Sequence, residues 1–236
     1  MKPKTTKRAL WIALGGQTLQ GLGIAWAIYL YNQQHSANYS LLCNFVSELG
    51  SPHQSMMAKV FNRTLIYTSP LVFPIVWSLG THIRTKLSYT AIATGFCALL
   101  GAVGVGVLPM DFLKPHLIAA MMFFWGWLLT MFLFTAAFCR KYSFKASPAL
   151  MISGIVAMVA CGTFLRYLGK SVAAFQRAGL LNGTATGKAL PTLESFHRPA
   201  IWDIAILEWG VVFSIALWVL VTFIYLLRVK ETTREG

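Results

Sequence analysis

The stretch that decides the fold is IAILEWGVVFSIALWVLVTFIYLL, residues 204–227, in which Glu208 is the one formally charged residue. An α-helix needs about 20 mostly apolar residues to cross the hydrocarbon of a bilayer. This stretch therefore predicts a membrane-spanning helix. A carboxylate about one turn inside such a helix is costly to bury, which makes Glu208 a candidate functional residue.

Five further stretches have the same apolar character. They cover about 9–31, 64–80, 87–108, 116–138 and 146–165, and the second contains Pro70 and Pro74. Hydrophobic residues make up 56% of the chain and charged residues 11%, against about 25% charged residues in a typical soluble domain. We therefore expect an all-α, polytopic integral membrane protein, with a single domain over residues 1–236 that forms a six-helix transmembrane bundle.

The net charge of +13 indicates the orientation of this bundle. Twelve Lys and Arg residues fall at the termini or in connections on the same side, and eight fall on the opposite side. Because Lys and Arg collect on the cytoplasmic side of membrane proteins, both termini are predicted to be cytoplasmic. We expect the membrane to be a bacterial inner membrane, and the charge pattern argues against a nucleic-acid partner.

Two predicted outer segments are long, at residues 32–63 and 169–203, and long ordered loops often build or cover a site. The acids also collect on this side, where five of the seven fall: Glu48, Asp111, Glu194, Asp203 and Glu208. The outer face is therefore where we expect a functional site.

Small residues recur along the third span at Ala91, Gly95, Ala98, Ala102 and Gly106. Steps of three and four residues place them on one helix face, where they allow another helix backbone to approach closely. This pattern predicts close helix packing and carries no information about chemistry.

The polar residues that the topology brings together predict a pocket at the outer leaflet. Arg166 ends the fifth span at the level of Glu208 and Asp111, and is the expected counter-ion for one of them. His116 opens the fourth span, directly after Pro115. The residues expected to line the pocket are Ser47, Glu48, Asn62, Asp111, His116, Arg166 and Glu208.

Three functions are consistent with such a pocket. The first is binding of a lipid headgroup or a small polar ligand. The second is a membrane-embedded hydrolase or transferase acting on lipid-linked substrates, with His116 as general base and Glu208 or Asp111 as its orienting partner. The third is a structural or assembly subunit without a ligand. A transporter is disfavoured, because the charged residues cluster at one face.

We expect no cofactor and no metal, because no pair of ligating residues has the spacing of one helix face. The expected partners are membrane lipids, and a homo-oligomer or another membrane protein is a further possibility.

Short motifs add a family resemblance. Ser47-Glu48-Leu49-Gly50 with Pro52, Phe61-Asn62, and GVGVLPMD (residues 104–111) followed by His116 resemble the prokaryotic membrane family catalogued as domain of unknown function 998. The chain is also distantly similar to the damage-regulated autophagy modulator family, in which a Glu-Trp pair stands where this chain has Glu208-Trp209. The resemblance implies a six-helix integral membrane protein and supplies no reaction.

Overall fold

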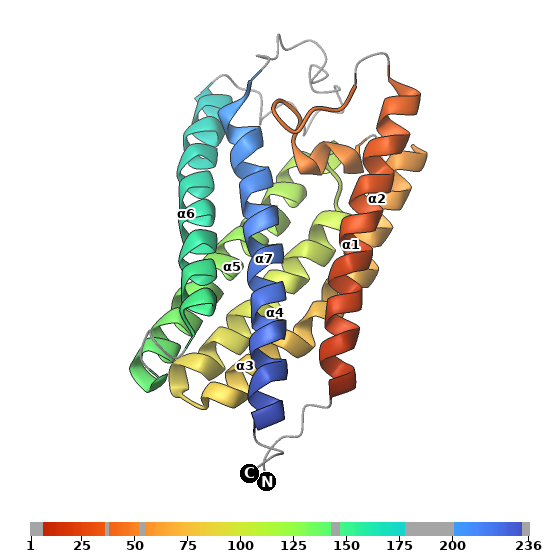
Figure 1. The fold of residues 1–236 in the computed structure, drawn as a ribbon. Helices are drawn as coiled ribbons and strands as arrows, with labels where there is room; N and C mark the ends of the chain where they lie inside the picture. Colours follow the sequence, from red (N-terminus) through yellow and green to blue (C-terminus); the bar gives the residue numbers. More distant parts are fainter. Residues whose placement is uncertain (1–6, 36–37, 52–54, 143–146, 178–200, 233–236) are drawn as a thin grey trace.

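The computed structural model describes residues 7–35, 38–51, 55–142, 147–177 and 201–232, and over these residues the chain is helical without a β-strand (Figure 1). The predicted all-α fold is confirmed. The helices are α1 (Lys7–Gln34), α2 (Met56–Thr68), α3 (Phe73–Ile83), α4 (Lys86–Val107), α5 (Leu113–Tyr142), α6 (Pro148–Arg177) and α7 (Asp203–Thr232). Three short 3₁₀ segments accompany them: η1 (Val46–Gly50), η2 (Ser69–Val72) and η3 (Met110–Phe112).

Five helical segments are long and apolar enough to cross a membrane, namely Met56–Ile83, Lys86–Val107, Met110–Tyr142, Pro148–Lys170 and Asp203–Val229. Their outward-facing side chains are also apolar, and Leu22, Ile118 and Val159 are each more than 60% exposed. A surface of this kind requires lipid around it. The chain is therefore a polytopic helical membrane protein.

The first helix is the least apolar of the six long helical segments. At 28 residues α1 has the length to cross a bilayer, but it carries Gln17, Thr18 and Gln20 in its middle. It packs along α2 and η2 (Figure 1). That α1 also crosses the membrane stays a prediction.

Two predicted boundaries differ from the structure. Residues 56–63, which the sequence placed in the outer loop 32–63, form the first turns of α2, because the Ser55 hydroxyl oxygen accepts the Ala58 N–H at 3.0 Å and caps the helix. The exposed residues Lys59 and Arg63 hid this start from a search for apolar residues. Likewise α6 continues to Arg177, into the predicted segment 169–203, of which residues 178–200 lie outside the described part.

The second membrane segment bends where α2 meets α3. Pro70 and Pro74 have no N–H to donate to the preceding helical turn, and the backbone tightens there into η2. The Thr68 hydroxyl donates to the Thr64 carbonyl at 2.7 Å within the same region. The bend leaves Ser69 and Val72 buried inside the bundle.

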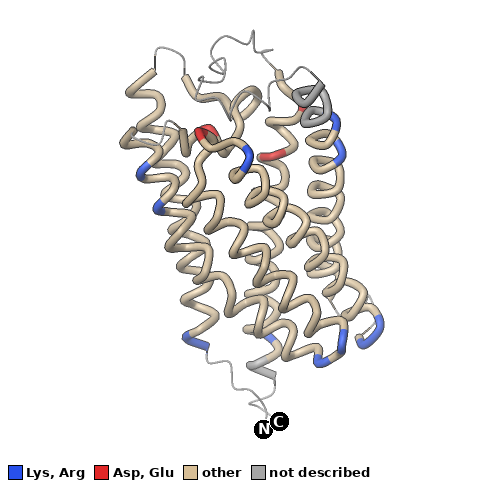
Figure 2. The backbone as a smooth tube through the Cα atoms, turned by 180° about the vertical axis from the view of Figure 1, so that it is seen from behind, with Lys and Arg blue, Asp and Glu red and all other residues tan. Residues whose placement is uncertain are grey.

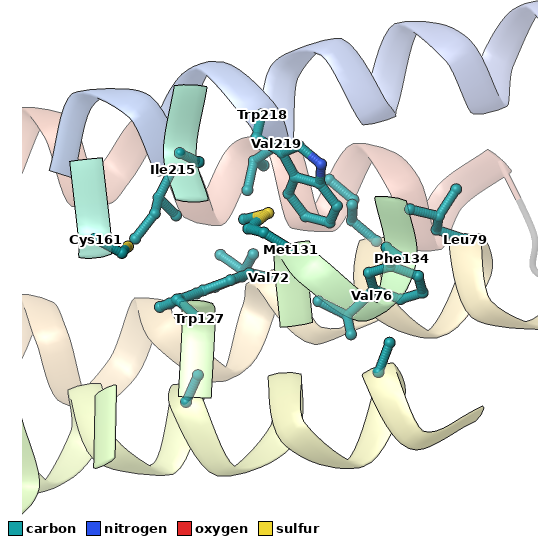
Figure 3. Close-up of a cluster of buried hydrophobic side chains, with 14 of the residues drawn as sticks. Val72, Val76, Leu79, Trp127, Met131, Phe134, Cys161, Ile215, Trp218 and Val219 are labelled. Atoms are coloured by element: carbon teal, nitrogen blue, oxygen red, sulfur yellow. The ribbon is translucent and has the colours of Figure 1, made fainter. Parts of the chain in front are cut away.

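The core lies between α3, α5, α6 and α7. Figure 3 shows Trp127, Phe134 and Trp218 pointing toward one another, with ring centroids 6.0 Å apart for the tryptophan pair and 5.9 Å apart for Phe134 and Trp218. Met131 and Val219 fill the space beside them and are fully buried. Buried aromatic pairs with these geometries contribute dispersion beyond their apolar area.

Helix α4 packs closely on two sides. The small-residue face predicted from the sequence is buried, and a Cβ on Gly106 would lie 2.7 Å from the Asn62 carbonyl oxygen of α2. A second set of contacts faces α5, where a Cβ on Gly101 would lie 2.5 Å from the Phe123 nitrogen and one on Gly126 would lie 3.0 Å from the Ala98 nitrogen. The sequence predicted close packing on this face without naming the neighbouring helix, and Ala98 of the same face contacts α5 as well.

The charges are distributed unevenly between the two ends of the bundle. Helix α1 begins and α7 ends at the same end, as an even number of passes requires (Figure 1). Figure 2 shows the Asp and Glu residues that it colours red toward the opposite end, while Lys and Arg occur at both ends. The acidic end is the one that carries η1 and the candidate site.

Candidate functional site

The loop between α1 and α2 is organised by the residues around η1. Phe45 is the residue that precedes the first turn of η1, and its N–H donates to Glu48 Oε1 at 3.1 Å. The other carboxylate oxygen of Glu48 accepts the Asn44 side-chain amide at 3.0 Å. Glu48 is 6% exposed, and its carboxylate accepts the backbone N–H of the residue before its own 3₁₀ turn, as in a helix capping box. Its contacts account for the SELG motif in structural terms.

Helix α7 holds this loop in place through side chains from its first turns. Glu208 Oε2 accepts the Val46 N–H at 2.7 Å, and the carboxylate also receives hydrogen bonds from Ser47. The next residue, Trp209, donates its indole N–H to the Asn44 carbonyl at 3.1 Å. Backbone donors of η1 therefore surround a carboxylate that enters from a different helix. They supply the partner that a buried carboxylate needs.

Three further hydrogen bonds attach the loop to its surroundings. The Trp202 N–H donates to the Leu42 carbonyl at 2.8 Å at the start of α7. The Asn62 amide of α2 donates to the Gly50 carbonyl at 3.2 Å, and the Ser51 hydroxyl donates to Asp111 Oδ1 of η3 at 2.6 Å. Asn62 and Asp111 thus anchor the end of the loop.

Tyr39 joins the start of the same loop to its turn. Its hydroxyl donates to the Phe45 carbonyl at 2.8 Å, and its ring packs edge-on against Trp209 with centroids 6.2 Å apart. Burial raises the pKa of the Tyr39 phenol far above its usual value, and the nearby carboxylates of Glu208 and Glu48 raise it further. The folded protein therefore keeps Tyr39 protonated in alkaline solution.

This pKa shift predicts a loss of stability at high pH. Above about pH 10 a tyrosine in the unfolded chain releases its proton while folded Tyr39 retains it, so the unfolded state is favoured increasingly as the pH rises. Between pH 9 and 11, the wild type is expected to lose up to about 1.4 kcal/mol per pH unit more than Tyr39→Phe. Melting curves in detergent measure the difference. The exposed Tyr29→Phe is the control, and equal slopes for all three proteins would contradict the prediction.

His116 lies one turn into α5 and is 4% exposed. Its Nδ1 lies 2.7 Å from the Leu108 carbonyl oxygen. Because a carbonyl oxygen can only accept a hydrogen bond, Nδ1 must carry the proton of the ring. That bond fixes the orientation of the ring and leaves Nε2 as the nitrogen that can accept from a ligand. The hydrogen bond of the ring thus goes to the Leu108 carbonyl, while the Asp111 carboxylate lies close enough to act on the ring through its charge.

A cavity of about 200 Å³ lies directly beneath η1, between α1, α2, α4, α5 and α7. Its walls are mostly apolar and include six aromatic residues: Phe61, Phe123, Phe124, Trp127, Trp209 and Phe213. The polar residues that line it are Gln17, Gln20, Ser47, Ser69, His116 and Glu208. Among the described lining residues there is no Lys or Arg, so the walls carry no positive side chain to match a phosphate.

The cavity is elongated along the helices. On α5 its lining runs from His116 to Trp127, and on α7 from Glu208 to Ala216. At about 1.5 Å per helical residue, these stretches correspond to roughly 12–16 Å, or about half the hydrocarbon thickness of a bilayer. On one side the lining reaches the outer surface, because Gly21 of α1 is exposed and Phe213 of α7 is 57% exposed.

The site residues predicted from the sequence separate into three groups. Ser47, His116 and Glu208 line the cavity. Glu48, Asn62 and Asp111 belong to the hydrogen-bond network of the loop above it and do not line it. Arg166 is exposed on α6 and is not part of either, so the expected ion pair with Glu208 is not formed. The backbone N–H groups of η1 replace the counter-ion, which a sequence pattern of charges could not reveal.

Four polar or aromatic groups of the site were not predicted as such. Gln17 and Gln20 were visible as polar breaks in an apolar stretch, and this would have been sufficient to find them. Trp209 was recognised only as part of a Glu-Trp pair. Nothing in the sequence indicated that Ser69 lines the cavity, because its position depends on the bend at Pro70. Within the described residues no three His, Cys, Asp or Glu side chains gather as a metal site would require.

The helical segments define a polytopic membrane protein, and a cavity lies inside it toward the end that carries η1. A family model described as "Protein of unknown function (DUF998)" matches residues 19–186, and the chain belongs to this family. The match begins within α1, ends beyond α6 and includes the loop and His116. The resemblance seen in the motifs is confirmed, while the similarity to the autophagy modulators stays a prediction. No curated protein and no solved structure is significantly similar to the chain.

Proposed function

We propose that this membrane protein binds a neutral lipid, or a lipid-like small molecule, in the cavity beneath η1. The observation that supports the proposal most directly is the composition of the walls, which are mostly apolar and aromatic and carry a few polar side chains, among them His116 and Glu208 toward the end beneath η1. Binding sites of this kind bury an apolar body and use a few placed polar groups to orient the ligand.

The size of the cavity favours part of a lipid as the occupant. At about 200 Å³ it exceeds the engineered cavity of about 150 Å³ that binds benzene, and it is smaller than the pockets of about 300–1,000 Å³ that hold drug-sized molecules. The opening between Gly21 and Phe213 allows the remainder of a longer chain to stay among the surrounding lipids. A ligand that is soluble in the membrane can therefore place one end in the cavity.

The charge of the walls favours a neutral ligand over a phosphate. Glu208 is the charged residue of the lining, and Arg166, which the sequence suggested as a cation for the pocket, lies elsewhere on an exposed face. An anionic headgroup would find no Lys or Arg among the described lining residues and would lie beside the Glu208 carboxyl group. His116 Nε2 and the amide groups of Gln17 and Gln20 suit a hydroxyl or carbonyl group instead.

Filling the cavity is expected to displace the ligand. Ala216 lines the cavity on α7, and Ala216→Phe adds a ring that occupies much of the available space. Native mass spectrometry of the purified protein is expected to show a co-purified lipid on the wild type, with its occupancy reduced at least about tenfold on the variant, the loss that about 1.4 kcal/mol of binding energy corresponds to.

The matched control for this experiment is Ala93→Phe, which adds the same ring on the exposed face of α4. It is expected to retain the lipid at the occupancy of the wild type. Equal occupancy of all three proteins would indicate annular lipid only, and a wild type free of lipid under every mild extraction would also reject the proposal.

The hydrolase is the second candidate, and it depends on His116. The fixed orientation of the ring and a free Nε2 beside the cavity are what a general base needs. The partner of Nδ1, however, is the Leu108 carbonyl, which takes the place of the orienting carboxylate that such a base commonly has. Hydrolysis of the bound lipid that stops in His116→Gln would favour this candidate over simple binding.

We further propose that the end carrying η1 faces away from the cytoplasm of a bacterial inner membrane, because Lys and Arg are more frequent toward the other end. The partners consistent with this arrangement are membrane lipids. A second copy of the chain or another membrane protein remains a proposal of the same kind.

A further inference from the structure

The deep end of the cavity contains a polar group without a hydrogen-bond partner. Ser69 lines the cavity at the bend of the second membrane segment and is 1% exposed. Its hydroxyl oxygen is buried and has no partner. An unpaired buried hydroxyl lowers stability, and such groups in native proteins commonly mark a place that another molecule occupies.

Two amide side chains of α1 also line the cavity, Gln17 near this depth and Gln20 about 4.5 Å nearer the η1 end. Gln17 and Gln20 of α1 are partly buried in a bundle whose other walls are apolar. Helix α1 touches the bend here, because a Cβ on Gly16 would lie 3.4 Å from the Thr68 carbonyl oxygen and closer still to the Leu71 side chain. Gln17, the next residue of α1, is therefore at the level of the bend and lines the same cavity as Ser69. The three polar side chains together can both donate and accept hydrogen bonds.

This polar group is well separated from the polar end beneath η1. Ile24 of α1 packs in the same buried cluster as Trp209 and so marks the level of Glu208. Gln17 precedes Ile24 by seven residues, which corresponds to about 10 Å along the helix. Phe61 belongs to that cluster as well, and Ser69 follows it by eight residues, or about 12 Å. The cavity thus has polar groups at two levels, marked by Glu208 and Ser69, with a mostly apolar wall between them.

We infer that Ser69, Gln17 and Gln20 form a second hydrogen-bonding subsite, which takes a hydroxyl or carbonyl oxygen of the bound molecule at mid-membrane depth. The inference rests on the proposed function and specifies its ligand: a neutral lipid with hydrogen-bonding oxygens at two positions, separated by an alkyl stretch of about 10 Å. One oxygen lies near His116 and the other near Ser69. A ligand with a single polar end would leave the deep level unsatisfied.

Two simple alcohols test this arrangement. Octanol has one terminal hydroxyl, and the corresponding terminal diol of octane has two, at a spacing close to that between the two levels. Their apparent dissociation constants are measured from the rise in melting temperature of the purified full-length protein in detergent. Comparing the ratio of the two constants between variants cancels the different partitioning of the alcohols into detergent.

Ser69→Ala and the double variant Gln17→Leu/Gln20→Leu are expected to weaken binding of the diol about fivefold to tenfold while changing that of octanol by less than about twofold. Thr222→Val is the matched control for Ser69, since Thr222 also carries a buried, unpartnered hydroxyl but does not line the cavity. Thr18→Val is the control for the glutamines, because Thr18 is an exposed polar residue of the same helix.

The outcomes separate this inference from the proposed function. An unchanged ratio in Ser69→Ala and in the glutamine variant overturns the second subsite, and if Ala216→Phe still abolishes octanol binding, the cavity remains a ligand site. A loss of equal size for both alcohols indicates that the deep level holds only water or shapes the wall, and this also overturns the subsite. Stabilisation by neither alcohol, or stabilisation insensitive to Ala216→Phe, rejects both proposals.

Discussion

The Gly101→Ala variant is expected to lose about 3 kcal/mol of stability, an unusually large effect for a single methyl group. The added Cβ would lie 2.5 Å from the Phe123 nitrogen, 2.8 Å from its Cα and 2.9 Å from the Ala119 carbonyl oxygen. All three atoms belong to the backbone of α5, which cannot turn aside as a side chain can. Helices α4 and α5 must therefore separate along their contact. The melting temperature in detergent measures the loss.

The control for this variant is Gly162→Ala on α6, where a Cβ would meet no atom within 4 Å. Because alanine favours the helix over glycine, this variant is expected to be neutral or to gain up to about 1 kcal/mol. A melting temperature of Gly101→Ala equal to that of Gly162→Ala would contradict the close approach of α4 and α5.

Replacing Glu208 by alanine is expected to reduce the stability by about 3 kcal/mol, which corresponds to roughly 6–12 °C in melting temperature for a chain of this size. The substitution removes the acceptor of the Val46 N–H and of the Ser47 hydrogen bonds, and it leaves these donors buried without a partner. Glu208→Gln keeps one acceptor oxygen and is expected to lose less than half as much. The measurement is a melting curve of each variant in the same detergent.

Asp203→Asn provides the comparison, because Asp203 is an exposed carboxylate in the first turn of the same helix and its change is expected to cost no more than about 0.5 kcal/mol. If Glu208→Ala matched this small loss, the anchoring of the loop by α7 would be refuted. Since Glu208 supports the loop, its variants are unsuitable as a test of ligand binding, and Ala216 and Ser69 serve that purpose better.

The membrane architecture could be predicted from the sequence because it depends on local composition. The long apolar stretch at residues 204–227 predicts a membrane-spanning helix, and α7 begins within one residue of the predicted start. The start of α2 was missed for the same reason, since Lys59 and Arg63 project outward from a helix whose other face is buried. A long apolar run can be seen in the segment itself, whereas the burial of one helix face depends on the other helices that pack against it.

The site was predicted only in part, because its contacts join distant segments. Proximity to the membrane face was sufficient to select His116, Ser47 and Glu208. It could not distinguish Arg166, which shares their level but is exposed on α6. Nor could it show that Glu208 would find its donors in the backbone of residues 46 and 47, since backbone N–H groups leave no trace in the amino-acid sequence.

The contact between η1 and α7 also constrains the order in which the protein can be completed. Val46 belongs to the connection after the first helix, but the carboxylate that accepts its N–H is supplied by the last helix, 162 residues later. Until α7 is inserted, the Val46 N–H and the Asn44 carbonyl of this connection lack the partners that Glu208 and Trp209 supply. Insertion of the final helix closes the connection and the cavity beneath it in one step. A chain that stops before residue 208 would therefore expose an unfinished loop to membrane proteases, even with most of its helices already inserted.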